Sequence, residues 1–143
     1  MDADAALDFA LSDLVLALGL HRPDRTPCGQ PLSVSEGLTL LALDVTGPLV
    51  QRDLAFALKL EKSTVSRLVD GLARRGLVER DPHPQDGRQL LVGLTDVGRR
   101  QVTALRATRT ARMAGLLAAV PADQRDAVVK AVRLLVEAGN ATR

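Results

Sequence analysis

The segment from residue 62 to residue 75 combines apolar side chains at helical spacing with a second face of small polar and basic side chains. The apolar positions are spaced i, i+3, i+4 and i+7, which predicts that they pack inward: Val65, Leu68, Val69 and Leu72. The opposite face carries Lys62, Ser63, Ser66, Arg67 and Asp70. Ser63, Thr64 and Ser66 are short enough to let a helix approach phosphates and donate to phosphate oxygens or base edges, and Arg67 can bind guanine through two hydrogen bonds. An ordinary amphipathic surface helix has the same two faces, so this helix alone leaves both interpretations open.

A second polar cluster lies at a turn between two predicted strands, residues 77–80 and 89–94. The connecting residues 81–87 are rich in Asp, Pro and Gly, which are typical of turns. Arg88 follows directly, where an extended guanidinium can enter a narrow minor groove, and Asp86 is placed to hold that guanidinium by a charge-assisted pair. Asp-Gly-Arg is a turn in many proteins, so this cluster favours DNA binding only beside a helix-turn-helix.

The elements that must position these two clusters follow from periodicity and from start and stop signals. We predict helices over residues 3–18, 33–44, 49–58, 62–75, 95–120 and 121–138, with the strand pair between the fourth and fifth helices. Ser33 and Glu36 have the spacing of a capping box, Gly76 stands where a helix C-terminus needs glycine, and Thr95 is a good N-cap. The fold class predicted is mainly α with a small β-hairpin wing, a winged helix-turn-helix with N- and C-terminal dimerisation helices.

The charges of the 143-residue chain are unevenly distributed. Residues 1–58 hold three basic and eight acidic side chains, whereas residues 59–112 hold twelve basic and six acidic ones. A basic middle segment indicates a polyanionic partner, although solvated helix faces are an equal alternative on charge alone. Aromatic residues make up only 1% of the chain, which argues against a base-stacking platform for RNA or single strands.

In combination, these motifs resemble the MarR family (multiple antibiotic resistance regulators). The resemblance is close over residues 38–101, and the matching stretches are residues 51–55 (QRDLA), 62–72 (KSTVSRLVDGL), 76–80 (GLVER), 86–88 (DGR) and 94–99 (LTDVGR). It implies a homodimer that reads a palindromic operator in double-stranded DNA, with a possible small organic effector and no cofactor. It also implies which side chains contact DNA: Ser63, Thr64, Ser66 and Arg67 in the major groove, with Asp86 and Arg88 as the wing pair. Lys62, on the same outward face, is a further predicted DNA contact.

Two features depart from that family pattern. Lys59 stands in the turn before the fourth helix, where the family often has glycine. Because a non-glycine residue in the left-handed region costs roughly 1 kcal/mol, we expect this turn to use another geometry. The loop of residues 19–31 is unusually rich in proline, so the sequence does not predict its path.

The chain is predicted to form one protomer, residues 1–143, with a DNA-binding region over residues 33–100. Residues 1–20 and 101–143 are assigned to dimerisation helices, because the first, fifth and sixth helices carry more apolar surface than a small head can cover. No apolar run is long enough to span a membrane, and the acidic N-terminus lacks the basic region of a signal peptide, so the sequence predicts a cytoplasmic protein.

Other functions have less support in the sequence. Cys28, the only cysteine, is either an inert thiol or a redox switch, and the chain lacks the tyrosines that accompany cysteine in peroxide-sensing relatives. His21 and His83 are too few to predict a metal site, and no enzymatic motif is present. Two alternatives to a ligand-responsive repressor stay open: a winged-helix protein–protein interaction module without DNA binding, and a DNA-binding protein with no effector.

Overall fold

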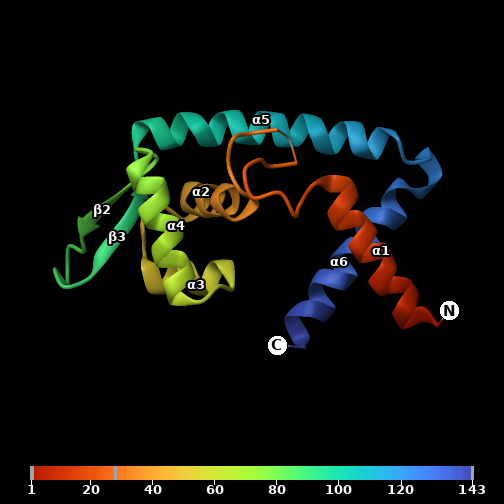
Figure 1. Ribbon diagram of the computed structural model, residues 1–143, viewed down its shortest axis with the longest axis horizontal. Helices are drawn as coiled ribbons and strands as arrows, with labels where there is room; N and C mark the ends of the chain where they lie inside the picture. Colours follow the sequence, from red (N-terminus) through yellow and green to blue (C-terminus); the bar gives the residue numbers. More distant parts are fainter. Residues whose placement is uncertain (1, 28, 143) are drawn as a thin grey trace. The chain divides into compact units, whose positions relative to one another are not determined.

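The computed structural model describes residues 2–27 and 29–142, so Cys28 and the question of its redox role lie outside the described residues. Helices dominate, with one small antiparallel sheet, which confirms the predicted fold class (Figure 1). The elements in chain order are α1 (Ala3–Leu18), α2 (Val34–Thr46), β1 (Leu49–Val50), α3 (Gln51–Leu58), α4 (Lys62–Arg74), β2 (Val78–Pro82), β3 (Leu90–Leu94), α5 (Asp96–Ala118), the 3-10 helix η1 (Ala122–Gln124) and α6 (Arg125–Ala141).

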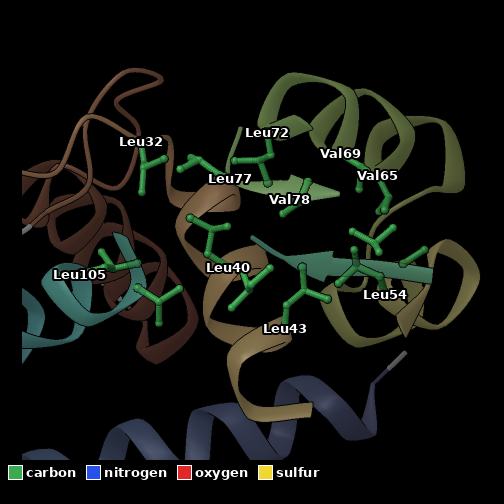
Figure 2. Packing of buried hydrophobic residues seen from close by; sticks show 14 residues of the cluster. Leu32, Leu40, Leu43, Leu54, Val65, Val69, Leu72, Leu77, Val78 and Leu105 are labelled. Atoms are coloured by element: carbon green, nitrogen blue, oxygen red, sulfur yellow. The ribbon is translucent and has the colours of Figure 1, made fainter. Parts of the chain in front are cut away.

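The chain divides into two compact units, residues 1–109 and residues 110–143. The first unit contains a head made of α2, α3, α4, the sheet and the first turns of α5. Its apolar core includes Val102 and Leu105 of α5, so the first turns of α5 pack with the head. The buried cluster consists of Leu32, Leu40, Leu43, Leu54, Ala55, Val65, Val69, Leu72, Leu77, Val78, Val92, Leu94, Val102 and Leu105. Figure 2 shows how Leu40, Leu43 and Leu72 of this cluster lie between the helices and the sheet.

The sheet has the strand order β1-β3-β2, and both pairings are antiparallel. Leu49 lies opposite Val92, and Val78 lies opposite Leu94. The prediction that a helix begins at Leu49 was wrong, because Leu49 and Val50 form the strand β1 and the helix α3 starts at Gln51. The hydrogen-bonding partner of β1 is β3, which is distant in sequence, so local periodicity gave no sign of this pairing.

Helix ends follow the predicted capping chemistry. Ser33 and Glu36 form the complete capping box of α2. Gly76 has φ 71°, and the backbone N–H groups of Gly76 and Leu77 donate to the carbonyls of Ala73 and Leu72, which is a Schellman motif at the end of α4. Thr95 caps α5 by accepting a hydrogen bond from the Gly98 N–H at 3.0 Å.

The turn between α3 and α4 corrects one expectation. Lys59 has φ 56° and ψ 40°, so this turn keeps the left-handed geometry although the residue is not glycine. The Lys59 and Leu60 N–H groups donate to carbonyls of the last turn of α3, which closes the helix. Leu58 and Leu60, on the two sides of Lys59, pack against the apolar core, and this packing outweighs a conformational cost of roughly 1 kcal/mol.

The second unit consists of the end of α5, η1 and α6. A sixth helix from Pro121 to about residue 138 was predicted, but Pro121 has φ −50° and ψ 136° and precedes η1, whereas α6 begins at Arg125 and continues to Ala141. The Arg125 guanidinium donates to the carbonyls of Val120 and Ala118, which satisfies acceptors at the end of α5. No residue of α6 is buried within the described chain.

Candidate DNA interface

Helix α4 presents the polar face that the sequence predicts. Val65, Val69 and Leu72 are fully buried, and Leu68 is only half-buried. On the other side, Lys62, Ser63 and Arg67 are exposed, whereas Thr64 and Ser66 are half-buried. The buried face fixes the helix on α3 and the sheet, so the exposed face of α4 keeps a constant direction toward solvent.

The C-terminal end of α4 is tied to the segment that precedes α2. The Arg75 guanidinium donates to Glu36 Oε2 at 3.2 Å and to the Pro31 carbonyl at 2.8 Å. The same loop reaches α5, because the Gln30 side chain accepts from Gln101 Nε2 at 2.9 Å. These contacts give the proline-rich loop a defined path and restrain α4 at its far end.

The strands β2 and β3 form a hairpin that extends beside α4, as Figure 1 shows. Residues 83–89 make its tip, which is closed by a hydrogen bond from the His83 N–H to the Gln89 carbonyl at 2.9 Å. The His83 ring also shapes the tip, because its Nδ1 accepts from the backbone N–H groups of Gln85 and Asp86 at 3.1 and 3.3 Å. His83 is therefore a structural part of the hairpin turn.

Asp86 and Arg88 are close, but the contact between them differs from the one expected. Asp86 Oδ1 accepts a hydrogen bond from the backbone N–H of Arg88 at 3.1 Å. Among the described residues, no ion pair joins the Asp86 carboxylate to the Arg88 guanidinium. The carboxylate thus shapes the turn, and the exposed Arg88 side chain extends from a fixed backbone position.

An open cavity of about 300 Å³ lies between the tip end of β3 and the start of α3. Its lining combines two guanidinium groups with two amides and two apolar side chains: Val50, Gln51, Arg52, Arg88, Gln89 and Leu90. Sequence reasoning did not assign Arg52 or Gln51 to the site. The β1–β3 pairing brings them beside Arg88, and nothing local in the sequence signals that pairing.

Sequence reasoning also missed Arg80 of β2. The Arg80 guanidinium contacts Asp70 Oδ1 of α4 at 2.6 Å and Gln51 Oε1 of α3 at 3.0 and 3.1 Å. Asp70 lies on the outward face of α4 as expected, with its side chain 47% exposed, and the ion pair with Arg80 was not predicted. Where the hairpin leads into α5, the hydrogen bond from Arg99 and the charges of Arg99 and Arg100 lower the pKa of Asp96.

Two further observations concern other kinds of site. Within residues 2–27 and 29–142, no three His, Cys, Asp or Glu side chains gather into a group that could hold a metal ion. In the same residues, no helix combines the length and hydropathy that a membrane span requires.

Comparison with known proteins decides the family. A family model described as the MarR family matches residues 30–89. An uncharacterised HTH-type transcriptional regulator of Mycobacterium leprae is 33% identical over 137 residues, which are 96% of this chain and 95% of that protein. This chain belongs to the MarR family. The resemblance identified from the motifs is thereby confirmed, and the chain is a DNA-binding transcriptional regulator with a winged helix-turn-helix head.

Solved structures of MarR-type regulators have the same fold. The PcaV transcriptional regulator of Streptomyces coelicolor, in complex with its natural ligand, aligns with a TM-score of 0.71 and 27% identity over 92% of this chain and 91% of that chain. An S. aureus MepR mutant bound to an oligodeoxyribonucleotide aligns with a TM-score of 0.55 and 26% identity over 75% of this chain and 79% of that chain. In this MarR-family chain, α4 occupies the place of a recognition helix and β2–β3 that of the wing.

Proposed function

We propose that this MarR-family chain is a ligand-responsive repressor that binds a palindromic operator in double-stranded DNA as a homodimer in the cytoplasm. The observation that carries the proposal is the pairing of an exposed, basic and hydroxyl-bearing face on α4 with an exposed arginine on the wing. A helix of this kind fits a major groove, and a hairpin arginine fits the adjacent narrow minor groove. The MepR mutant structure, with its bound oligodeoxyribonucleotide, supports DNA as the partner.

Each proposed contact has a role that follows from its chemistry. Lys62 and the hydroxyls of Ser63, Thr64 and Ser66 would contact phosphates at the groove edge, because they lie at or near the N-terminus of α4, where the helix dipole also favours anions. Arg67, one turn later, would read a base edge. On the wing, Arg88 would enter the minor groove, and Asp86 would hold the turn from which Arg88 extends.

Homodimerisation is supported by the apolar side chains of the terminal helices. Six large hydrophobic residues of α1 are exposed: Leu7, Phe9, Leu11, Leu14, Val15 and Leu16. In the second unit, α6 exposes another six: Val128, Val129, Val132, Leu134, Leu135 and Val136. Exposed apolar side chains in such number are typical of helices that pack against a partner, and an obligate dimer would bury more than about 2,000 Å² in total. Residues 1–20 and 101–143 are therefore the proposed dimerisation segments, and residues 33–100 the proposed DNA-binding region.

A dimer would account for both the palindromic form of the proposed operator and the proposed repression. Two identical heads related by a two-fold axis would bind two half-sites of a palindrome, and a dimer that covers an operator excludes other proteins from the same DNA. The PcaV regulator was solved with a natural ligand, which supports a ligand-responsive function. From the family resemblance, the effector is proposed to be a small, weakly acidic or aromatic organic molecule. The proposed effector changes the distance between the two DNA-binding heads of the dimer. It alters operator affinity only if it binds the dimer with one head distance more tightly than the dimer with the other.

The test begins with selection of bound sequences from a random double-stranded library, because the operator is unknown. The selected duplex and a shuffled duplex are then titrated at several salt concentrations, and the mass of the free protein is measured by light scattering. We expect an inverted repeat, a dimer mass, and preferential binding whose affinity falls steeply with salt. A chain that stays folded but binds neither duplex at low salt would instead be a protein–protein interaction module.

A further inference from the structure

Three elements of the head meet at one side chain, that of Arg80. Its Nη2 donates to Asp70 Oδ1 at 2.6 Å, and its Nε and Nη2 donate to Gln51 Oε1 at 3.1 and 3.0 Å. Arg80 belongs to β2 of the wing, Asp70 to the recognition helix α4, and Gln51 to the first turn of α3. The Arg80 side chain is 25% exposed and the Asp70 side chain 47% exposed, so the guanidinium is partly shielded from water whereas the carboxylate is more open to it.

The position of this contact along each element matters. The buried residues of α4 hold only its inward face, and the wing beyond Arg80 has little burial, since Asp81 and Pro82 of β2 and Leu90 of β3 are exposed. The pairing of β1 with β3 ends at Val50 and Leu91, so the sheet has only two strands beyond that point, and a two-stranded hairpin is marginally stable by itself. The Arg80 contacts lie where the wing leaves the core, and they join it by side chains to both helices of the helix-turn-helix.

The charges of Arg80 and Asp70 also indicate that their contact holds the wing on α4. Asp70 is a carboxylate on the helix that is proposed to approach a polyanion, where a free negative charge would repel phosphates. Arg80 neutralises it at hydrogen-bond distance, and a planar guanidinium satisfies two acceptors in fixed directions, which a lysine cannot do. An unpaired aspartate here would be unfavourable for DNA binding. The ion pair neutralises the Asp70 carboxylate and at the same time attaches the wing to α4.

We propose that Arg80 is a positioning residue that holds the wing at one angle to α4, so that the major- and minor-groove contacts of one head form together. The proposal rests on the proposed DNA-binding function. Two contacts joined by a rigid link bind more tightly than the same contacts joined loosely, because the second binds at a high effective concentration. Operator DNA binds the α4 contact and the wing contact at the same time, so a rigid attachment of the wing to α4 raises the affinity for the operator. Random DNA, which is bound mainly through charge, gains little.

The experiment compares Arg80→Ala, Arg80→Lys and Asp70→Asn with the unaltered protein, using the selected operator and a shuffled duplex across a salt series. We expect Arg80→Ala to weaken operator binding by about tenfold, a coupling typical of groups in direct contact, while shuffled-duplex binding changes by less than about threefold and the salt slope stays the same. Arg80→Lys should recover little of the operator affinity that Arg80→Ala loses, because lysine keeps the charge but not the two directed contacts. Arg100→Ala, which removes an exposed arginine of α5, is the control for loss of charge.

Asp70→Asn separates positioning from simple electrostatics. Removing the negative charge should tighten binding to the shuffled duplex, yet the weakened contact with Arg80 should leave operator binding unimproved, so the ratio of the two affinities falls. The proposal is overturned if Arg80→Ala weakens both duplexes equally with a shallower salt slope, since Arg80 would then be a direct phosphate contact. It is also overturned if the affinity ratio does not change in any of the three variants.

A measurement on the free protein keeps this inference distinct from the proposed function. Hydrogen exchange of the wing amides, residues 78–94, should become faster in Arg80→Ala, while the core amides of α2 and α4 keep their protection and the melting temperature changes little. If the unaltered protein bound no DNA, the proposed function would fail, and the exchange result would still test the Arg80 contact. Unchanged wing exchange would show that Arg80 does not hold the wing.

Discussion

The recognition helix and the wing belong to one head but are held in place by different forces. Helix α4 is fixed by fully buried Val65, Val69 and Leu72, each contributing roughly 1.5–3 kcal/mol by burial. The outer part of the wing depends on backbone pairing and on polar contacts at His83, Asp86 and Arg80, which contribute roughly 0.5–1.5 kcal/mol each. The helix is therefore a rigid support, whereas the wing is a weaker element whose position depends on a few polar side chains.

The largest expected effect comes from removing the apolar support of α4. Leu72→Ala should lower the free energy of unfolding by about 2–5 kcal/mol, because Leu72 is fully buried and a cavity would remain. Chemical denaturation with a structural probe measures this decrease. The matched change in the wing, Leu90→Ala, removes the same atoms from a side chain that is 46% exposed, and it should cost less than about 1 kcal/mol. Equal decreases for the two variants would contradict the contrast between the regions.

The next effect concerns base reading by the exposed face of α4. Arg67→Ala should weaken operator binding by ~1–3 kcal/mol per half-site and relax the preference at one base pair, because a guanidinium bound to guanine carries that discrimination. Titration of operators with single base changes measures it, and Lys62→Ala serves as the comparison for a phosphate contact. If each base change in the operator weakens binding of Arg67→Ala as much as it weakens binding of the unaltered protein, the assignment of Arg67 to a base edge is wrong.

The wing should respond differently from the helix. Arg88→Ala should weaken operator and shuffled duplex to similar extents, and the log–log salt slope should become shallower by roughly 0.9 for each phosphate that the arginine no longer neutralises. Salt titration of both duplexes measures this, with thermal melting as the check on folding. A weaker preference for one base pair, without a change in slope, would mean that Arg88 reads bases as Arg67 is expected to do.

Asp86→Ala provides the matched variant within the wing tip. Because Asp86 accepts the Arg88 backbone N–H, removing its carboxylate should loosen the turn and leave the guanidinium in place. We expect operator binding to weaken less than in Arg88→Ala, with the salt slope nearly unchanged. An effect larger than that of Arg88→Ala would show that the turn itself contacts DNA.

The smallest effect is expected at the turn that places the start of α4. Lys59→Gly should stabilise the protein by about 0.5–1 kcal/mol, because glycine adopts φ 56° without the clash that a Cβ causes. The melting temperature measures the gain, and operator affinity should change little if Lys59 makes no DNA contact. Destabilisation would show that interactions of the Lys59 side chain outweigh the strain in its backbone.

The sequence by itself determined those features that depend on neighbouring residues. The bounds of α1, the capping box of Ser33 and Glu36, the glycine turn at Gly76 and the two-faced helix α4 all follow from side chains within a few positions of one another. Local hydrogen bonds and helical spacing are enough to specify them. The family also followed from the order of such local motifs along the chain.

Only the tertiary structure decided the features that depend on distant partners. The strand β1 exists because β3 offers a hydrogen-bonding edge, and Lys59 keeps a strained geometry because packing on both sides of the turn requires it. Arg80 contacts Asp70 and Gln51 only because the sheet brings β2 beside both helices. In each case the favourable energy comes from groups far apart in sequence, so it cannot be detected in local periodicity or propensity.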